Sequence, residues 1–140
     1  MASYNKFNCF VENMAEGVHN LGSNTLKILL TNSAPSASNT VKANLTEISA
    51  GNGYSAGGIP ITITTSSQTA GVYSIVATDA VMTASGGSIG PYRYAVLYND
   101  TPTSPADPLI AWWDYGSSIT SADGEKLNLD FNPAGLFTIT

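Results

Sequence analysis

Apolar residues near the start of the chain recur every three or four positions, the spacing of one face of an α-helix. These residues are Phe7, Phe10, Val11, Met14, Ala15 and Val18. The pattern predicts an amphipathic helix over about residues 5–19, ended by the Asn20-Leu21-Gly22 segment. Such a helix can cover an open end of a β-fold, or it can dock on a partner, and both roles can hold at once.

Beyond Gly22 the apolar residues follow the two-residue period of β-strands. We expect strands at residues 26–31, 59–64, 72–77, 80–83, 92–98, 109–114, 126–131 and 136–139, with another strand or turn beginning near 45–48. Turn residues separate them, and residues 122–125 resemble a hairpin turn of the Asp-Gly kind. The larger apolar set on these strands predicts a core of Leu26, Ile28, Leu30, Ile61, Ile63, Ile75, Val96, Leu127, Leu129 and Phe131.

The segment 92–98 shows the strand period most clearly. One face is expected to carry Tyr92, Tyr94, Val96 and Tyr98. The other face is expected to carry Arg93, Ala95 and Leu97. An apolar face backed by a mixed face is typical of a strand in an antiparallel sheet.

The element order predicts a mainly β fold. Seven to nine short strands and one N-terminal amphipathic helix, without alternating strands and helices, indicate an antiparallel β-sandwich or Greek-key barrel. A chain of 140 residues is long enough for one such domain and too short for two ordinary ones. We therefore expect a single β-sandwich domain over residues 1–140.

Charged residues make up only 11% of the chain, and the net charge is −5. The basic residues are Lys6, Lys27, Lys42, Arg93 and Lys126, and no two are neighbours. This excludes the clustered basic surface that nucleic-acid binding needs.

No basic segment precedes an apolar one at the start, and no apolar run approaches membrane-spanning length, so we expect no signal peptide and no membrane partner. Cys9 has no second cysteine to pair with, as is typical of a protein made in a reducing cytoplasm.

Residues with catalytic chemistry are scarce. The one histidine, His19, falls at the end of the predicted helix, where we expect a polar residue facing the last carbonyls. A Ser-His-Asp triad would need His19, but no nucleophile elbow accompanies it, and one His with one Cys cannot form the usual zinc sites. The sequence therefore predicts no catalytic residue, no metal and no cofactor, and the chain is not expected to be an enzyme.

The acidic residues gather in the second half, mostly beside turn residues, where Asp usually bonds its own backbone. They are Asp79, Asp100, Asp107, Asp114, Asp123 and Glu125. Their oxygens leave a weak calcium site open, although no ligand loop has a recognisable spacing. A glycosidase carboxylate pair would require two of them to face each other across a cleft.

Two further features concern surfaces. The Gly-rich stretch 50–58 lacks the Lys-Ser/Thr ending of a phosphate-binding loop, and predicts an irregular loop with positive φ angles, pinned by Tyr54 against the sheet.

Trp112 and Trp113 are adjacent, so they should face opposite sides of a strand. One should be in the core; the other is a sheet-face aromatic or an exposed anchor, with an interface favoured over a sugar site.

Four segments resemble a group of small virion structural proteins of tailed bacteriophages. They are Leu45-Thr46-Glu47-Ile48, GNGYSAGG at 51–58, SGGSIGPYRYAVLYND at 85–100 and PLIAWWDYGSSIT at 108–120. The resemblance implies a β-sandwich protein present in many copies on the particle, in the capsid as a decoration (cement) protein, or in tail and fibre structures. It transfers no catalytic residues.

These observations lead to the expectation of a capsid decoration protein that binds the major capsid protein and copies of itself, with a trimer favoured. It would be made in the host bacterial cytoplasm and would lie on the capsid surface of the virion. The alternative is a tail or fibre module that binds a host-surface glycan or receptor through Trp112, Trp113 or the row of Tyr92, Tyr94 and Tyr98. The candidate interface residues are Phe7, Phe10, Met14, Val18, Tyr54, Trp112 and Trp113, together with the loops at 51–58 and 99–107.

Overall fold

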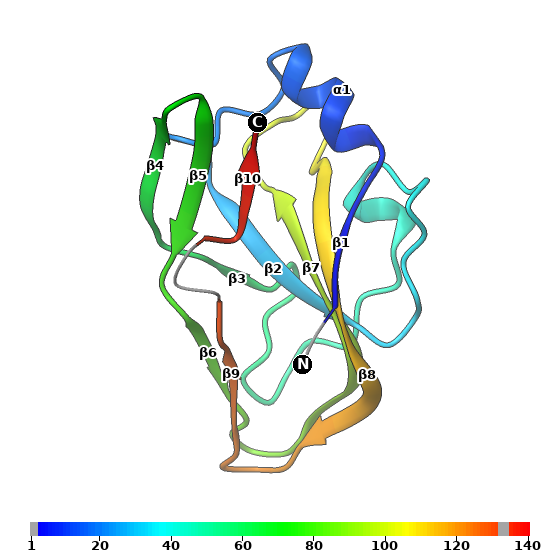
Figure 1. Cartoon of the computed structure of the whole chain (residues 1–140). Helices are drawn as coiled ribbons and strands as arrows, with labels where there is room; N and C mark the ends of the chain where they lie inside the picture. The colour runs from blue at the N-terminus through cyan, green and yellow to red at the C-terminus, as the bar shows by residue number, and fades with distance from the viewer. Residues whose placement is uncertain (1–2, 132–134) are drawn as a thin grey trace.

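The computed structural model describes residues 3–131 and 135–140 and is mainly β, with antiparallel pairing throughout (Figure 1). This confirms the predicted class. The described helices are α1 (Cys9–Ala15) and the short 3-10 helix η1 (Lys42–Asn44). The described strands are β1 (Ser3–Lys6), β2 (Leu26–Thr31), β3 (Ile59–Pro60), β4 (Ile63–Thr69), β5 (Val72–Ala77), β6 (Ala80–Thr83), β7 (Ile89–Asn99), β8 (Leu109–Ser121), β9 (Lys126–Leu129) and β10 (Phe137–Ile139).

The largest sheet has five strands in the order β1-β8-β7-β2-β3. Its centre is the pairing of the two longest strands, β7 and β8, and β2 runs along the other side of β7 with an unbroken register from Leu26↔Asn99 to Thr31↔Tyr94. Two smaller sheets, β10-β5-β4 and β6-β9, complete the strand pairing. In Figure 1, β4, β5, β6 and β9 lie on the side of the molecule away from β8.

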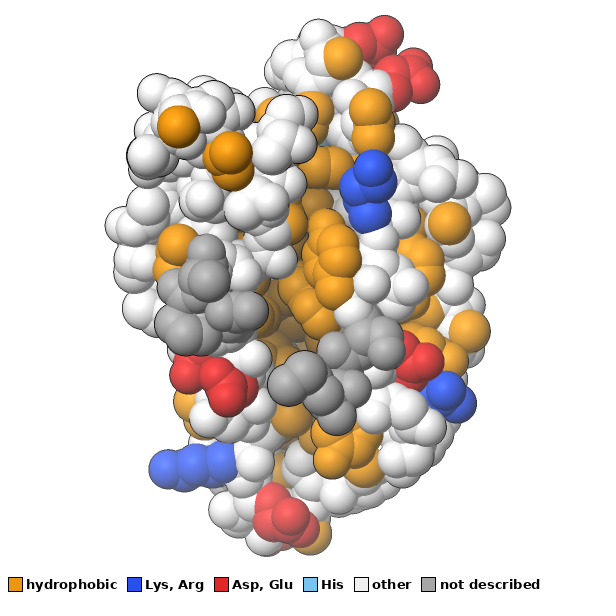
Figure 2. All heavy atoms as spheres, viewed as in Figure 1, with side chains coloured by type: hydrophobic (Ala, Val, Ile, Leu, Met, Phe, Trp, Pro, Cys, Tyr) orange, Lys and Arg blue, Asp and Glu red, His pale blue; other side chains and the backbone are white. Residues whose placement is uncertain are grey.

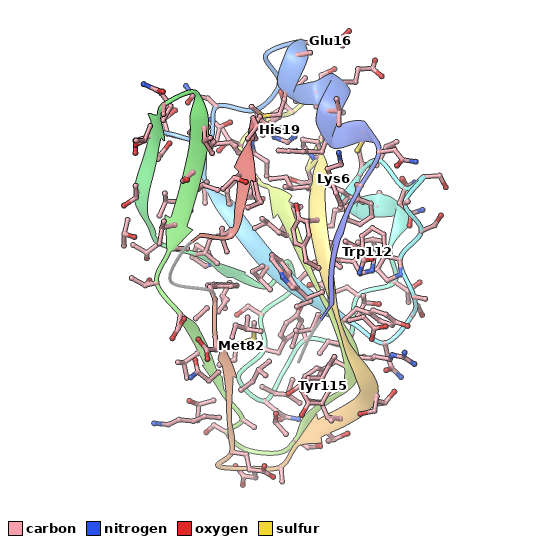
Figure 3. All side chains as sticks on the ribbon, in the orientation of Figure 1. Lys6, Glu16, His19, Met82, Trp112 and Tyr115 are labelled. Atoms are coloured by element: carbon pink, nitrogen blue, oxygen red, sulfur yellow. The ribbon has the colours of Figure 1, made fainter. Side chains whose placement is uncertain are left out.

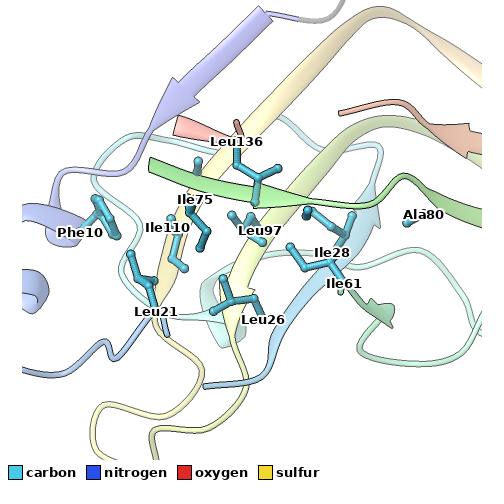
Figure 4. Packing of buried hydrophobic residues seen from close by; sticks show 12 residues of the cluster. Phe10, Leu21, Leu26, Ile28, Ile61, Ile75, Ala80, Leu97, Ile110 and Leu136 are labelled. Atoms are coloured by element: carbon cyan, nitrogen blue, oxygen red, sulfur yellow. The ribbon is translucent and has the colours of Figure 1, made fainter. Parts of the chain in front are cut away.

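The main core lies between the large sheet and the smaller sheets (Figure 4). The large sheet contributes residues such as Ile28, Leu97 and Ile110, and the opposing side contributes Ile75 and Ala80. Phe10 of α1 and Leu21 close one end of this cluster. The helix is therefore part of the core and covers an end of the β-structure.

The opposite face of the large sheet is also buried. A second cluster there is made of Phe7, Leu29, Val96, Tyr98 and Leu109. Burial on both faces explains why five of the six residues of β2 are buried, rather than every second one. A third cluster, around Leu30, Tyr54 and Tyr92, lies towards β6 and β9.

The predicted core is confirmed. None of its ten residues is exposed, and six of them are buried. The buried ones are Leu26, Ile28, Leu30, Ile61, Ile75 and Val96. Ile63, Leu127, Leu129 and Phe131 are partly buried and pack against the main and third clusters.

The N-terminal helix is much shorter than the predicted span 5–19. Residues 3–6 form β1, which pairs with β8 in the register Tyr4↔Trp113, and α1 occupies only Cys9–Ala15. Gly17 follows the helix with a φ of 77°, a conformation that commonly ends helices. The helical spacing misled because Phe7 and Phe10 belong to two different clusters, on opposite faces of the large sheet. With β1 and the separation of β3 from β4, the described residues contain ten strands rather than seven to nine.

The predicted hairpin at 122–125 is wrong, although the turn exists. The amide of Glu125 donates to the Ala122 carbonyl at 2.8 Å, and Gly124 has a φ of 89°. The strands that the turn joins belong to different sheets, since β8 pairs with β7 and β1 while β9 pairs with β6. The chain thus uses this turn to leave the large sheet.

The strict alternation predicted for 92–98 is also wrong at its start. The register between β7 and β8 shifts between Ile89 and Tyr92 and again between Tyr92 and Tyr94. Tyr92 therefore packs in the third cluster, whereas Val96 and Tyr98 pack on the opposite face of the sheet. Extra residues in one strand of an antiparallel pair bend it and re-aim its side chains.

Candidate functional site

A groove of about 390 Å³ opens between the large sheet and the segment that contains β9. Its described lining includes Tyr94 of β7, Trp113 and Tyr115 of β8, and Leu127 and Phe131 from the β9 side. Figure 2 shows hydrophobic side chains exposed in a hollow near the middle of this face. Aromatic and aliphatic surface in a concave site, with few polar groups, is the usual composition of a small-ligand pocket.

Trp113 is held from two sides. Its ring centroid lies 5.7 Å from that of Tyr4 in an edge-on arrangement and 6.1 Å from that of Phe131. Tyr4 is placed by its pairing opposite Trp113, and the Phe131 amide donates to Asp79 Oδ1 at 2.9 Å. The indole is therefore held between Tyr4 of the neighbouring strand β1 and Phe131 of the groove lining.

Tyr115 is the most open aromatic side chain of the groove. Its exposed fraction is 56%, the highest among the large hydrophobic residues that the structure describes as exposed. It lies two residues after Trp113 on β8, and Figure 3 shows it on a different side of β8 from Trp112. The groove thus presents one anchored ring and one solvent-facing ring.

The charged residues beside the groove are largely neutralised. Arg93 donates from Nε to Asp114 Oδ1 at 2.8 Å and from Nη2 to Oδ2 at 3.2 Å. The hydrogen bonds from Arg93 and from the Gly116 amide lower the pKa of Asp114. The hydrogen bond to Asp114 raises the pKa of Arg93. Asp130 is the one carboxylate among the described residues that line the groove. The described lining thus offers one carboxylate, whereas a glycosidase uses two that flank the scissile bond.

Trp112 faces the other side of β8. Its ring centroid lies 4.5 Å from that of Phe7, and it packs against the cluster that contains Val96 and Tyr98. The prediction that the two tryptophans face opposite sides is confirmed. Both remain partly exposed, and neither is wholly core.

Three of the predicted interface residues are buried within the chain itself. Phe7, Phe10 and Tyr54 are each at most 4% exposed. Of the two roles open for the apolar N-terminal stripe, Phe7 and Phe10 therefore seal their own subunit. Met14 and Val18 are partly exposed and remain available for contact, as do the two tryptophans.

The Gly-rich loop has the predicted character. Positive φ angles occur at Gly51, Asn52, Gly53, Gly57 and Gly58. The Tyr54 hydroxyl accepts a hydrogen bond from the Leu30 amide at 3.0 Å and donates to Glu47 Oε1 at 2.6 Å, and the same carboxylate oxygen accepts from the Gly57 amide at 2.6 Å. Burial and the Glu47 carboxylate raise the pKa of Tyr54. The loop is pinned by Tyr54 to the sheet.

His19 does not lie at a helix end facing carbonyls, as the sequence suggested. It follows α1, is 6% exposed, and packs beside Phe10 with a ring-centroid distance of 5.4 Å. Burial lowers its pKa to about 4. The cause of the difference is the early end of α1, which turns the chain back over the core.

Two further observations bear on chemistry and location. In the described parts of the chain, no three His, Cys, Asp or Glu side chains come together as a metal site would require. Among the same residues, no helix has the length and apolar character needed to cross a membrane.

Sequence reasoning did not select Tyr4, Tyr115 or Phe131 for the site. Tyr115 had a local signal, since it lies two positions after Trp113 and residues so spaced share a strand face. Phe131 was expected in the core, and nothing local indicates that it meets Trp113. No protein-family model matches the chain, and comparison with curated proteins and with solved structures finds no significant match either.

Proposed function

We propose that this chain is a structural protein of a bacteriophage virion, and specifically a capsid decoration (cement) protein that binds and stabilises the lattice of the major capsid protein. The sequence support is the resemblance of residues 45–48, 51–58, 85–100 and 108–120 to such proteins. The proposal places the protein on the capsid surface after synthesis in the bacterial cytoplasm. Its partners are the capsid protein and copies of itself, and neither nucleic acid nor a membrane.

The structural observation that supports this function most is the exposed edge strand β4. Both faces of the large sheet carry a buried cluster, and β4, at the edge of the three-stranded sheet, is open to solvent. Six of the seven residues of β4 are exposed, and they are Thr, Ser and Gln. An edge strand offers unpaired backbone groups to a neighbour, and small neutral side chains allow close approach without charge repulsion.

Stabilisation would follow from mass action. A protein that binds only the assembled, expanded lattice lowers the free energy of that lattice relative to its alternatives. We propose a small symmetric oligomer, with a trimer favoured, because several linked contacts hold a small subunit far more tightly than one. Light scattering coupled to size-exclusion chromatography tests this part of the proposal.

For the fold we propose a β-sandwich. The support is the main core cluster, which joins Ile28 and Leu97 of the large sheet to Ile75 of β5 and Ala80 of β6. Two packed sheets that share such a core lie about 10 Å apart. An experimental structure with that layer spacing would support the assignment, whereas a closed barrel would rule it out.

The decisive experiment counts and locates the protein. Quantitative mass spectrometry of purified virions should give hundreds of copies per particle, and cryo-electron microscopy should place them on the outer capsid. Ser67→Glu, on exposed β4, should weaken retention on the capsid, whereas the matched control Ser117→Glu, on exposed β8, should not. A few tens of copies or fewer, located on the tail, would reject the decoration function.

A second candidate function is favoured by the groove beside Trp113 and Tyr115. A tail or fibre module that binds a host-surface glycan would use aromatic rings in an open concave site. A low copy number together with tail location would select this function instead.

A further inference from the structure

We infer that the groove between β8 and the β9 segment is a binding site for a neutral oligosaccharide, with Trp113 and Tyr115 as the stacking surfaces. The inference rests on the second candidate function and is independent of how the chain binds a capsid lattice. It assigns a ligand class and adds roles for Tyr115 and the β9 side to a site of which the sequence indicated Trp113.

The shape and lining fit one or two sugar rings. At about 390 Å³ the groove falls in the usual range for small-ligand sites. A pyranose ring has an apolar face of C–H groups and a polar edge of hydroxyls. Trp113 and Tyr115 provide flat apolar surfaces for such a face, and Leu127 and Phe131 line the other wall.

The arrangement is preorganised. Trp113 is braced by Tyr4 at 5.7 Å and Phe131 at 6.1 Å between ring centroids, so little side-chain freedom remains to be lost on binding. Tyr115 is more exposed and sits next to Gly116, whose amide is tied to Asp114 Oδ1 at 2.8 Å. One fixed ring and one accessible ring suit a ligand that enters the groove from solvent.

Charge selects a neutral ligand. The lining residues Asn128 and Asp130 are exposed and supply a hydrogen-bond donor and acceptors for hydroxyl groups. Arg93 is already engaged by both carboxylate oxygens of Asp114, and the whole chain carries a net charge of −5. Anionic sugars would therefore meet repulsion, and the described lining residues include no free cation to offset it.

The test uses tryptophan fluorescence of the full chain. The probes are maltohexaose, cellohexaose, mannohexaose and xylohexaose, with hexagalacturonic acid as the anionic comparison. Trp112→Phe leaves Trp113 as the one tryptophan, and Trp113→Phe leaves Trp112, which packs on the other face of β8 against Phe7. At least one neutral probe should change the emission of the Trp112→Phe variant and leave that of Trp113→Phe unchanged.

Affinity measurements complete the test. Tyr115→Ala should weaken binding of the neutral probe about tenfold, because a stacking ring is lost from an exposed position that does not support the fold. Trp112→Phe should bind as the wild type does, and hexagalacturonic acid should bind at least about tenfold more weakly than the neutral probe.

Three results would overturn the inference. They are no response to any neutral probe, equal affinity in the wild type and Tyr115→Ala, or a Trp113 emission change caused by capsids and not by sugars. The last result would make the groove a lattice contact and leave the decoration function intact. Conversely, sugar binding without capsid binding would support the groove assignment and reject the decoration function.

Discussion

The side-chain amide of Asn99 donates to Nδ1 of His19 at 3.0 Å, and this contact defines the protonation state of the one histidine. Asn99 Oδ1 accepts from the Thr101 amide at 3.1 Å, so its Nδ2 is the group that faces His19, and Nδ2 also donates to Asn24 Oδ1 at 2.9 Å. His19 Nδ1 must therefore accept, which places the ring proton on Nε2. Nε2 is buried and has no hydrogen-bond partner among the described residues.

This arrangement predicts acid sensitivity. Protonation of Nδ1 would place two donors against each other, and burial lowers the pKa of His19 from 6.5 to about 4. Between these pH values the folded chain binds fewer protons than the unfolded chain. The contribution of neutral His19 to the free energy of unfolding is therefore complete above pH 6.5 and is lost as the pH falls towards 4. The loss should be on the order of 3 kcal/mol of unfolding free energy.

His19→Asn checks this prediction, because Asn keeps an acceptor near the Nδ1 position and does not titrate. Urea unfolding at a series of pH values should show a weaker pH dependence for the variant than for the wild type between pH 4 and pH 6.5. Identical slopes in the two proteins would mean that His19 titrates normally in the folded chain.

Gly58→Ala should abolish or strongly weaken folding. Gly58 has a φ of 81°, and an added Cβ would overlap the carbonyl oxygen of Ile28 and lie 2.8 Å from the Cα of Leu29, both in the central part of the large sheet. We expect a loss of more than about 3 kcal/mol. Gly71→Ala is the matched control, since Gly71 has a φ of 83° with nothing within 4 Å of the new Cβ. It should cost only about 1 kcal/mol. Similar losses for both variants in urea unfolding would contradict the steric argument.

Tyr54→Phe should destabilise the chain by about 1–3 kcal/mol. The change leaves the buried Leu30 amide without its 3.0 Å acceptor and removes the donor to Glu47. Tyr73→Phe is the control, because its hydroxyl contacts Ser66 at 2.7 Å at an exposed site where water can replace it. Thermal unfolding should separate the two variants clearly; a Tyr54→Phe protein as stable as Tyr73→Phe would show that the loop is not pinned by this hydroxyl.

Deletion of residues 2–20 should prevent folding. The deletion removes β1 together with Phe7 and Phe10, and truncation of a buried Phe alone typically costs about 3–5 kcal/mol. The sum is close to the whole stability of a small domain. The point variant Val11→Glu instead alters a side chain that is 54% exposed on α1, so circular dichroism should show a native fold. If α1 contacts a neighbouring subunit, Val11→Glu should elute from size-exclusion chromatography at a smaller oligomeric size than the wild type. A deletion chain that folds normally would show that the N-terminal segment is only an appendage.

Several features followed from local sequence alone. Alternating and continuous apolar residues predicted β2 and β5 and the core positions on them, because burial on a strand requires apolar side chains at those positions whatever the partner strand. The glycines around Tyr54 predicted a loop with positive φ angles, since only a residue without Cβ adopts them cheaply. The opposite directions of Trp112 and Trp113 followed from strand geometry.

Tertiary structure decided the rest, because pairing and packing depend on residues far apart in the chain. Residues 3–6 became β1 because the edge of β8 pairs with them, which overrode the helical spacing of Phe7 and Phe10. The turn at 122–125 joins two sheets because β9 pairs with β6 instead of β8. The groove forms where Phe131 packs against Trp113. His19 is buried because α1 ends early. Periodicity reports which side of an element faces an apolar surface, whereas the identity of that surface is fixed only when the whole chain competes for burial and backbone hydrogen bonds.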